Sequence, residues 1–430
     1  MLKSYLIVLA LFTNLSVIAQ QYQLDSVVHN INGNQLMVSQ KYDAENRKAE
    51  LIRYKRQGTN DAIQKTERTE LIYDDKGNEL YHVFSVWNSI NNKWDEEEKT
   101  EQEFNTDNHL IRLSTYRKNN NKWLKVFENK KTYTQDSIIE TDYEIKNDKF
   151  QPIHKNISVI NSFGKIKTYE IFLWNDKSQI WTPLVRTTNN YQNDTIMIGF
   201  ETIEWNENQW QKQEKVVYEL DKNNRPTENY TLYKGHNNQW IPNLKFEEKS
   251  LPQQSKKTSS TYKWDDINNK WILNTQIETN FNDEGKKQDV LFSEIDTKGQ
   301  LNLQLEQLNL YDKKGRLTLF QDFTHSDEIK TGIQNTFKFD EVGNLIQENL
   351  YDLDSEKETW NNKMTTEFLY DKNIKMSMVL EDQKRFDLFN LNVYNSKINK
   401  EAIKQVKIYS YDTGKKVLSE EFEYFYSITK

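Results

Sequence analysis

The carboxylates that stand closest together are the first candidates for metal binding or acid–base chemistry. Asp74 and Asp75 begin a short polar loop that contains Gly77, and acidic loops of this kind can bind calcium. The ligand spacing differs from that of an EF-hand. An Asp at the start of a turn also accepts hydrogen bonds from backbone N–H groups ahead of it, so we expect these residues to shape a turn.

Other catalytic patterns are lacking. Glu96–Glu98 are adjacent carboxylates, but glycoside hydrolysis needs two carboxyl groups on opposite sides of one cleft. The chain has no Cys, which excludes thiol catalysis and Cys-ligated zinc. We expect no enzyme, no metal and no cofactor. The histidines lie in different repeats without the spacing of metal ligands: His29, His82, His109, His154, His236 and His325.

Tryptophan is the residue type with the most promise for binding. Trp87–Trp94 and Trp264–Trp271 enclose Asn- and Lys-rich loops, here called Trp loops. Their trailing rings could stack on sugars or on the side chains of a partner. Alternatively each ring packs on its own loop, which Phe150, Leu301 and Ile333 at equivalent positions favour. The candidate stacking residues are Trp94, Trp123, Trp181, Trp210, Trp240, Trp271 and Trp360.

The elements that position these residues are strands joined by tight turns. Glu70–Leu80 predicts a strand, a turn and a strand, because Gly77 tolerates positive φ. This phrase, here called the Asp turn, recurs every 27 to 31 residues, with a last gap of 41. Its opening residues are Tyr42, Tyr73, Phe104, Tyr133, Ile160, Tyr191, Leu220, Leu251, Phe281, Tyr311, Phe339, Tyr370 and Tyr411.

The period predicts an all-β array of about 12–13 antiparallel β-hairpin repeats of roughly 30 residues each. Each repeat contains one Asp turn, one Trp loop and two strands. At about 4.8 Å per strand, a flat ribbon of roughly 25 strands would exceed about 100 Å. Because open twisted sheets of that size curl or split, we expect a long coiled or superhelical sheet.

Composition and length fit one repeat array. The hydrophobic content is 36% and the aromatic content 13%, whereas disordered chains lack aromatic residues. We expect a single array over residues 20–430, with an irregular last segment over residues 381–430. Residues 405–417 are similar in part to an end-domain used as a type IX secretion signal, but we expect a last hairpin there.

The first residues predict export. Residues 1–19 combine Lys3, a short apolar run and Ala19 before the cut, as in a signal peptide. An uncleaved membrane anchor is the alternative, but Asn14 interrupts the run, and we expect no transmembrane segment after signal removal. The product would be periplasmic, on the outer surface or extracellular. The net charge of −7 is interspersed, which argues against nucleic acid as a partner.

The phrases Tyr73–Asn78, Tyr311–Arg316, Phe339–Asn344 and Tyr411–Lys415 resemble the YD repeat of Rhs-type proteins. With its Trp loop, the unit is similar to secreted YD-like repeat proteins common in Bacteroidota. The resemblance covers about residues 36–428 and implies an array of β-hairpins. In large members it implies a shell around toxin cargo or a surface adhesion module. This array is too short for such a shell.

We therefore expect a non-enzymatic exported repeat protein that serves as a cell-surface or extracellular binding or structural scaffold. Its partner class would be a glycan or a cell-surface protein. The alternative is a carbohydrate-active enzyme or a carbohydrate-binding protein that uses the tryptophan series. An enzyme of this kind requires a cleft with convergent carboxylates, and a binding protein requires accessible rings.

Overall fold

The structure is a computed structural model that describes residues 21–58, 61–146, 149–251, 255–326, 330–379, 400–412 and 414–429. These residues form one antiparallel sheet of 26 strands and a short 3-10 helix, η2. The all-β prediction is confirmed. Among them, no helix has the length and apolar character that crossing a bilayer requires. The predicted signal over residues 1–19 lies outside the described residues.

The strands follow one another along the chain and most are joined by short turns. The connection from β24 to β25 is longer and contains η2, which spans Met376–Met378. Residues that favour strands occupy these segments and turn residues separate them, so the hairpins form as the repeat predicts. Their bounds are β1 Tyr22–Ile31, β2 Asn34–Tyr42, β3 Lys48–Arg56, β4 Gln64–Tyr73, β5 Glu79–Asn88, β6 Lys93–Phe104, β7 Leu110–Asn119, β8 Lys122–Tyr133, β9 Ser137–Lys146, β10 Lys149–Ile160, β11 Ile166–Asn175, β12 Ile180–Gln192, β13 Ile196–Asn206, β14 Gln209–Leu220, β15 Pro226–His236, β16 Gln239–Leu251, β17 Lys256–Asp265, β18 Lys270–Phe281, β19 Lys287–Ile295, β20 Leu301–Tyr311, β21 Leu317–His325, β22 Lys330–Phe339, β23 Leu345–Asp354, β24 Thr359–Lys375, β25 Glu401–Asp412 and β26 Lys415–Ile428.

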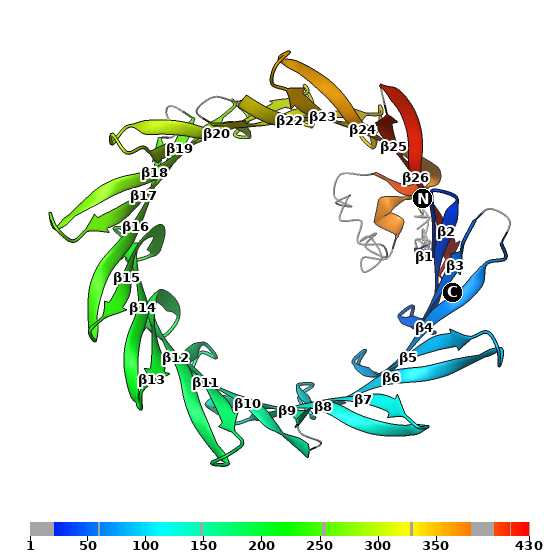
Figure 1. Cartoon of the computed structure of the whole chain (residues 1–430), viewed down its shortest axis with the longest axis horizontal. Coiled ribbons are helices and arrows are strands. Elements are labelled where there is room, and N and C mark those ends of the chain that lie inside the picture. The colour runs from blue at the N-terminus through cyan, green and yellow to red at the C-terminus, as the bar shows by residue number, and fades with distance from the viewer. Residues whose placement is uncertain are drawn as a thin grey trace, which may run out of the picture.

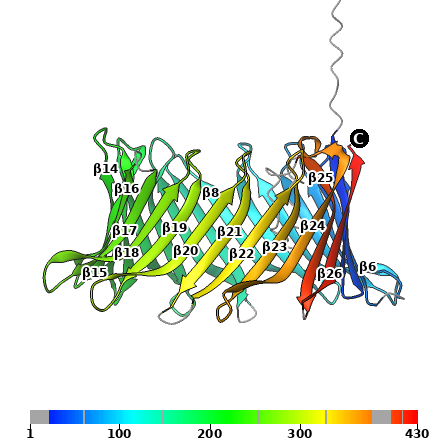
Figure 2. The ribbon, with the colours of Figure 1, turned by 90° about the horizontal axis from the view of Figure 1, so that it is seen from above.

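The sheet closes on itself. Each strand pairs with the next, and β1 also pairs with β26. Figure 1 shows the resulting ring, and Figure 2 shows the tilt of its strands. The expected coiled or superhelical sheet is therefore wrong. Closure removes both edges, which would otherwise present unpaired N–H and C=O groups. With a tilt of roughly 40° and about 4.8 Å between strands, the ring is roughly 50 Å across.

Bulges supply the curvature. The register shifts beside the aromatic residue that opens an Asp turn, as between Ile72 and Tyr73. It shifts again near the Trp loop, as between Phe84 and Ser85. A bulge bends its strand and increases the local twist. Repeated in successive hairpins, these bends turn a ribbon into a ring.

The Asp turns adopt the predicted geometry. The Oδ1 atom of Asp74 accepts hydrogen bonds from the N–H groups of Lys76 at 2.9 Å and Asn78 at 2.8 Å. The side chain of Asn78 also donates to Asp74, and these hydrogen bonds lower the pKa of the Asp74 carboxyl. Positive φ is confirmed at the fourth residue after the opening one, in Asn46, Gly77, Asn108, Gly164, Asn224, Gly285, Gly315 and Gly343.

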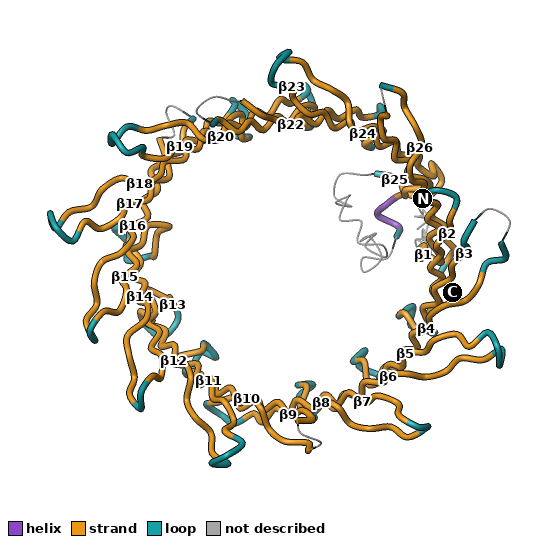
Figure 3. Tube along the Cα trace, in the orientation of Figure 1, coloured by secondary structure: helices purple, strands orange, loops and turns teal. Residues whose placement is uncertain are grey.

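The Asp turns and the Trp loops lie at opposite rims (Figure 2). At the rim of the Trp loops, long hairpins such as β5–β6, β13–β14 and β15–β16 bend away from the ring (Figure 3). The strands between the rims form a thin wall. The Trp loops are therefore the most projecting part of the described molecule.

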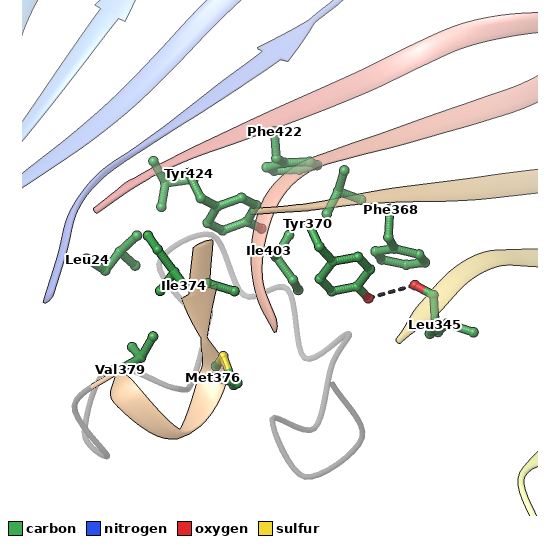
Figure 4. Packing of buried hydrophobic residues seen from close by; sticks show 13 residues of the cluster. Leu24, Leu345, Phe368, Tyr370, Ile374, Met376, Val379, Ile403, Phe422 and Tyr424 are labelled. Carbon is green, nitrogen blue, oxygen red and sulfur yellow. Dashed lines mark hydrogen bonds between the residues drawn. The ribbon is translucent and has the colours of Figure 1, made fainter. Parts of the chain in front are cut away.

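The main hydrophobic core lies where the ring closes. Leu24 and Val27 of β1, Phe422 and Tyr424 of β26, and Met376 of η2 belong to one buried cluster (Figure 4). The helix η2 lies inside the ring (Figure 3), which places this cluster on the inner face. The closing strands are thus packed under an inner cover, whereas most of the wall is half-buried.

Candidate binding surface on the Trp loops

Within the described residues, two tryptophan rings meet edge to face across the hairpin in four of the Trp loops. In the β5–β6 hairpin, Trp87 pairs directly with Trp94, and their ring centroids are 4.9 Å apart at 70°. Edge-to-face pairs of this kind contribute about 0.5–1.5 kcal/mol beyond their buried area. They hold the projecting hairpins closed. The other pairs, with centroids 5.1 to 5.2 Å apart, are Trp174 with Trp181, Trp205 with Trp210, and Trp264 with Trp271.

Cations from the preceding hairpin cover several of these rings. Lys65 Nζ lies 4.5 Å from the ring centroid of Trp87, and the guanidinium carbon of Arg68 lies 5.2 Å from that of Trp94. Such cation–π contacts contribute about 0.5–1 kcal/mol at exposed sites. They connect these Trp loops to the hairpins before them. The same relationship joins Lys99 to Tyr116 and Trp123, Lys155 to Phe172 and Trp181, Arg186 to Trp210, and Lys212 to Trp240.

The structure places all seven candidate stacking tryptophans on half-buried positions. Trp94, Trp181, Trp210 and Trp271 belong to the edge-to-face pairs. Trp360 stands beside Phe323, with 5.7 Å between ring centroids. Lys99 and Lys118 each place their Nζ 5.3 Å from the ring centroid of Trp123, and Lys212 does so for Trp240. Four of the seven rings are therefore paired within their own hairpins, and all seven have part of their surface already used by the protein.

In three other loops with the spacing of seven, the trailing residue is not directly paired with the aromatic residue seven positions earlier, although the rings of Tyr143 and Phe150 still stack at 5.9 Å. The direct partner of Trp123 is Lys118, that of Phe150 is Ile145, and that of Trp240 is Gly235. In the first and last loops, two successive Asn residues with positive φ make the turn: Asn120 and Asn121, and Asn237 and Asn238. These tight turns shift the pairing away from Tyr116 and Tyr233, so spacing alone does not identify the partner ring.

Salt bridges cover the wall beside the Trp loops. Lys99 pairs with Glu101 at 2.6 Å and lies over Tyr116. Burial of Glu128 raises the pKa of its carboxyl, but hydrogen bonds from Lys125 and Lys130 outweigh burial and lower this pKa below its usual value. These carboxylates are held ionised by neighbouring cations. On this surface, ion pairs between oppositely charged side chains surround the aromatic pairs.

The other chemical candidates stay dispersed. Glu96 pairs with Lys118 at 3.0 Å, and Glu98 with Arg117 at 3.1 Å. His29 Nε2 lies 2.9 Å from Glu420, in a different part of the ring. Within the described ranges, no three His, Asp or Glu side chains are grouped so that they could hold a metal ion. The turn interpretation of Asp74 agrees with its hydrogen bonds.

Sequence reasoning missed the covering cations and Gly235. The cations are scattered among many Lys and Arg residues, so their partners depend on the twist of the sheet. Gly235 left a signal: Trp205–Lys212 and Gly235–Pro242 align residue by residue, with Gly235 at the place of Trp205. That comparison could have identified it as the loop that lacks a ring.

No family model matches the chain, and no curated protein matches it either. Solved structures similar to it include TcdB2-TccC3, at 11% identity and a TM-score of 0.33, over 90% of this chain and 23% of that chain. A protein of unknown function from Bacteroides fragilis is 13% identical, with a TM-score of 0.20, over 36% of this chain and 91% of that chain. A porin-like protein from Bacteroides uniformis is 8% identical, with a TM-score of 0.15, over 70% and 94% of the two chains. The chain spans about a quarter of TcdB2-TccC3.

Proposed function

We propose that this chain is a non-enzymatic, exported scaffold that binds a glycan or a surface protein at the cell envelope or outside the cell. The observation that carries the proposal is the closed sheet with its projecting hairpins, which bear similar aromatic pairs. A closed ring holds these hairpins at fixed positions. Repeated weak sites on a rigid frame reach high avidity when a partner engages several of them.

The charge state of the carboxyl groups supports binding over catalysis. A glycosidase needs one carboxyl group whose pKa is raised so that it can donate a proton. Among the described residues, the carboxyl groups with a clear shift have lowered pKa values. The largest single influence on Glu247 is the hydrogen bond from Lys245, and on Asp265 it is the hydrogen bond from Asn268. Carboxylates that stay ionised and accept hydrogen bonds in this way stabilise the fold and are not suited to donate a proton.

Projecting apolar residues support a role in contacts. Ile90 and Ile267 occupy the same place in two Trp loops with nearly the same sequence. Their exposed fractions are 92% and 90%. Both stand at the tip of a hairpin that bends away from the ring, where a partner would meet them first. An exported binding protein gains contact area from such tips.

The test is a binding screen combined with an assay for hydrolysis. The purified protein would be titrated against soluble glycans and cell-wall fractions, and the release of reducing sugar would be followed in the same samples. We expect saturable binding without product. A control with Ile90→Ser and Ile267→Ser together would show whether the tips contribute. Measurable hydrolysis of any fraction, with no stable binding, would contradict the proposal in favour of a carbohydrate-active enzyme.

A further inference from the structure

One hollow on the Trp-loop surface has the features of a small-molecule site. It lies between the tips of two neighbouring hairpins, β13–β14 and β15–β16, and has a volume of about 280 Å³. That volume is near the lower end of the range for ligand sites and suits one sugar ring. The residues that line it on the two sides include Trp210, Gln211 and Lys212 from β14, and Gly235, His236 and Asn238 from β15 and its turn.

The hollow exists because one ring of an aromatic pair is replaced by glycine. In the β13–β14 hairpin, Trp205 pairs with Trp210 across a two-residue turn. In the β15–β16 hairpin the corresponding pair is Gly235 with Trp240. A Cβ atom on Gly235 would overlap the carbonyl oxygen of Lys212. The glycine thus lets the two hairpin backbones approach each other while the absent ring leaves space beside them.

The lining combines an aromatic ring with groups that bind hydroxyls. The side-chain amides of Gln211 and Asn238 can each donate and accept, and the imidazole of His236 can do either. Trp210 supplies the apolar surface on which the C–H face of a sugar can rest. Amides around an aromatic ring match a ligand that carries many hydroxyl groups.

The charge of the hollow favours an acidic ligand. Lys212 Nζ lies 5.3 Å from the ring centroid of Trp240. In the described part of the chain, no carboxylate forms an ion pair with this ammonium, and no carboxylate lines the hollow. By contrast, Lys99 of β6 and Lys245 of β16 each hold a carboxylate at 2.6 Å. An ammonium that contacts a ring but forms no ion pair with a described carboxylate is available to a carboxylate on a ligand.

We propose that this hollow binds one uronic acid unit of an acidic saccharide. Lys212 pairs with the carboxylate of the sugar, and Asn238 and Gln211 bind its hydroxyl groups. The inference rests on the proposed binding function and names the class of ligand for one site. It requires only this pair of hairpins, so it can fail while the scaffold function stands.

The test uses tetragalacturonate as the acidic probe and cellotetraose as the neutral one, with isothermal titration calorimetry of the full protein. Lys212→Met keeps the length of the side chain and removes its charge. Asn238→Gly keeps the positive φ of 57° and removes the amide. The matched controls are Lys118→Met and Asn121→Gly in the β7–β8 hairpin, where Lys118 also lies 5.3 Å from a tryptophan, Trp123.

We expect tetragalacturonate to bind and cellotetraose to bind more weakly. Lys212→Met should weaken acidic binding about tenfold or more, as loss of a charge-assisted hydrogen bond implies, and both controls should match the unmodified protein. Circular dichroism would verify that each variant is folded. Absence of tetragalacturonate binding at millimolar concentration, or equal affinity of Lys212→Met and the unmodified protein, would overturn the inference. If both Lys212→Met and Asn238→Gly still bind tetragalacturonate as the unmodified protein does, the proposed site is wrong but the scaffold function is not contradicted.

Discussion

The hydroxyl of Tyr370 donates a 2.6 Å hydrogen bond to the backbone carbonyl of Leu345, which lies 25 residues earlier in the chain (Figure 4). Tyr370 is the opening residue of one repeat, and Leu345 is the first residue of β23. The bond therefore joins one repeat to the repeat before it, at the rim of the Asp turns. The same link recurs from Tyr42 to Leu24, Tyr133 to Leu110, Tyr191 to Ile166, Tyr311 to Lys287 and Tyr426 to Ile403.

Removing this hydroxyl where it is buried should destabilise the ring. We expect Tyr370→Phe to lower the free energy of unfolding by about 1–3 kcal/mol, because the buried carbonyl of Leu345 loses a hydrogen bond that water cannot easily replace. Tyr311→Phe is the control, since its bond to Lys287 is exposed to solvent and should matter less. Urea unfolding measures both, and equal losses would contradict the role of burial.

Substitution of Gly77 tests how much the Asp turn depends on positive φ, because an added side chain would not clash there. The φ of Gly77 is 87°, and no atom lies within 4 Å of a Cβ built on it. Gly77→Ala should therefore cost about 1–2 kcal/mol from backbone strain alone. Gly77→Asn should cost less, because Asn108 occupies the same turn position with φ 68°. The midpoint of thermal unfolding tests the order, and an Ala variant as stable as the Asn variant would refute it.

The turns and hairpins could be predicted because the residues that determine them lie within each repeat. The turn requires positive φ at its fourth residue after the opening one, and Gly or Asn at that position tolerates it. An Asp or Asn directly after the opening residue accepts hydrogen bonds from backbone N–H groups ahead of it. Asp74, Asn161 and Asn282 all do so. The hairpin array and its strands follow from these turns and the period between them.

Closure could not be predicted from the repeat. It depends on pairing between β1 and β26, which lie at opposite ends of the chain. The pairing requires that many small bends add up to a full circle. Each bend comes from a bulge beside a residue such as Tyr73, and the repeat pattern does not reveal how strongly it curves the sheet. The nearly constant period is equally compatible with a coil and with a ring.

The candidate surface was predictable in position but not in detail. Trp94 and Trp271 stand in the expected loops, yet their environment depends on neighbouring hairpins. Arg68 reaches Trp94 from another repeat, 26 residues earlier in sequence. Such contacts arise from strand twist and side-chain reach. Gly235 is the exception, because an alignment of the loops shows it directly.

Acid should weaken the Asp turns where the first residue is Asp. Hydrogen bonds from the backbone of Arg316 and then from its guanidinium lower the pKa of the Asp312 carboxyl. The unfolded carboxyl has a pKa of about 3.9. Because the folded pKa is lower, this stabilisation is complete above about pH 4 and is lost as the pH falls through the folded value.

Asp312→Asn should therefore reduce the acid dependence of stability while keeping the turn, since Asn282 accepts the same backbone hydrogen bonds one repeat earlier. The measurement is urea unfolding at pH 6 and pH 3. The control is Asp75→Asn, because no described residue donates a turn hydrogen bond to the Asp75 side chain. A difference between the two pH values that is as large in Asp312→Asn as in the unmodified protein would contradict this account.

The closing strands should respond most to a cavity in the core. Phe422 of β26 is 1% exposed and stacks on His29 of β1, with ring centroids 4.0 Å apart. We expect Phe422→Ala to cost about 3–5 kcal/mol. Since the lost contacts join β1 to β26, hydrogen exchange should accelerate first in these two strands and later in β13 and β14. Phe163→Ala, at a 60% exposed position, should change stability by less than about 0.5 kcal/mol. Uniform acceleration around the ring would show instead that closure is no weaker than any other pair of strands.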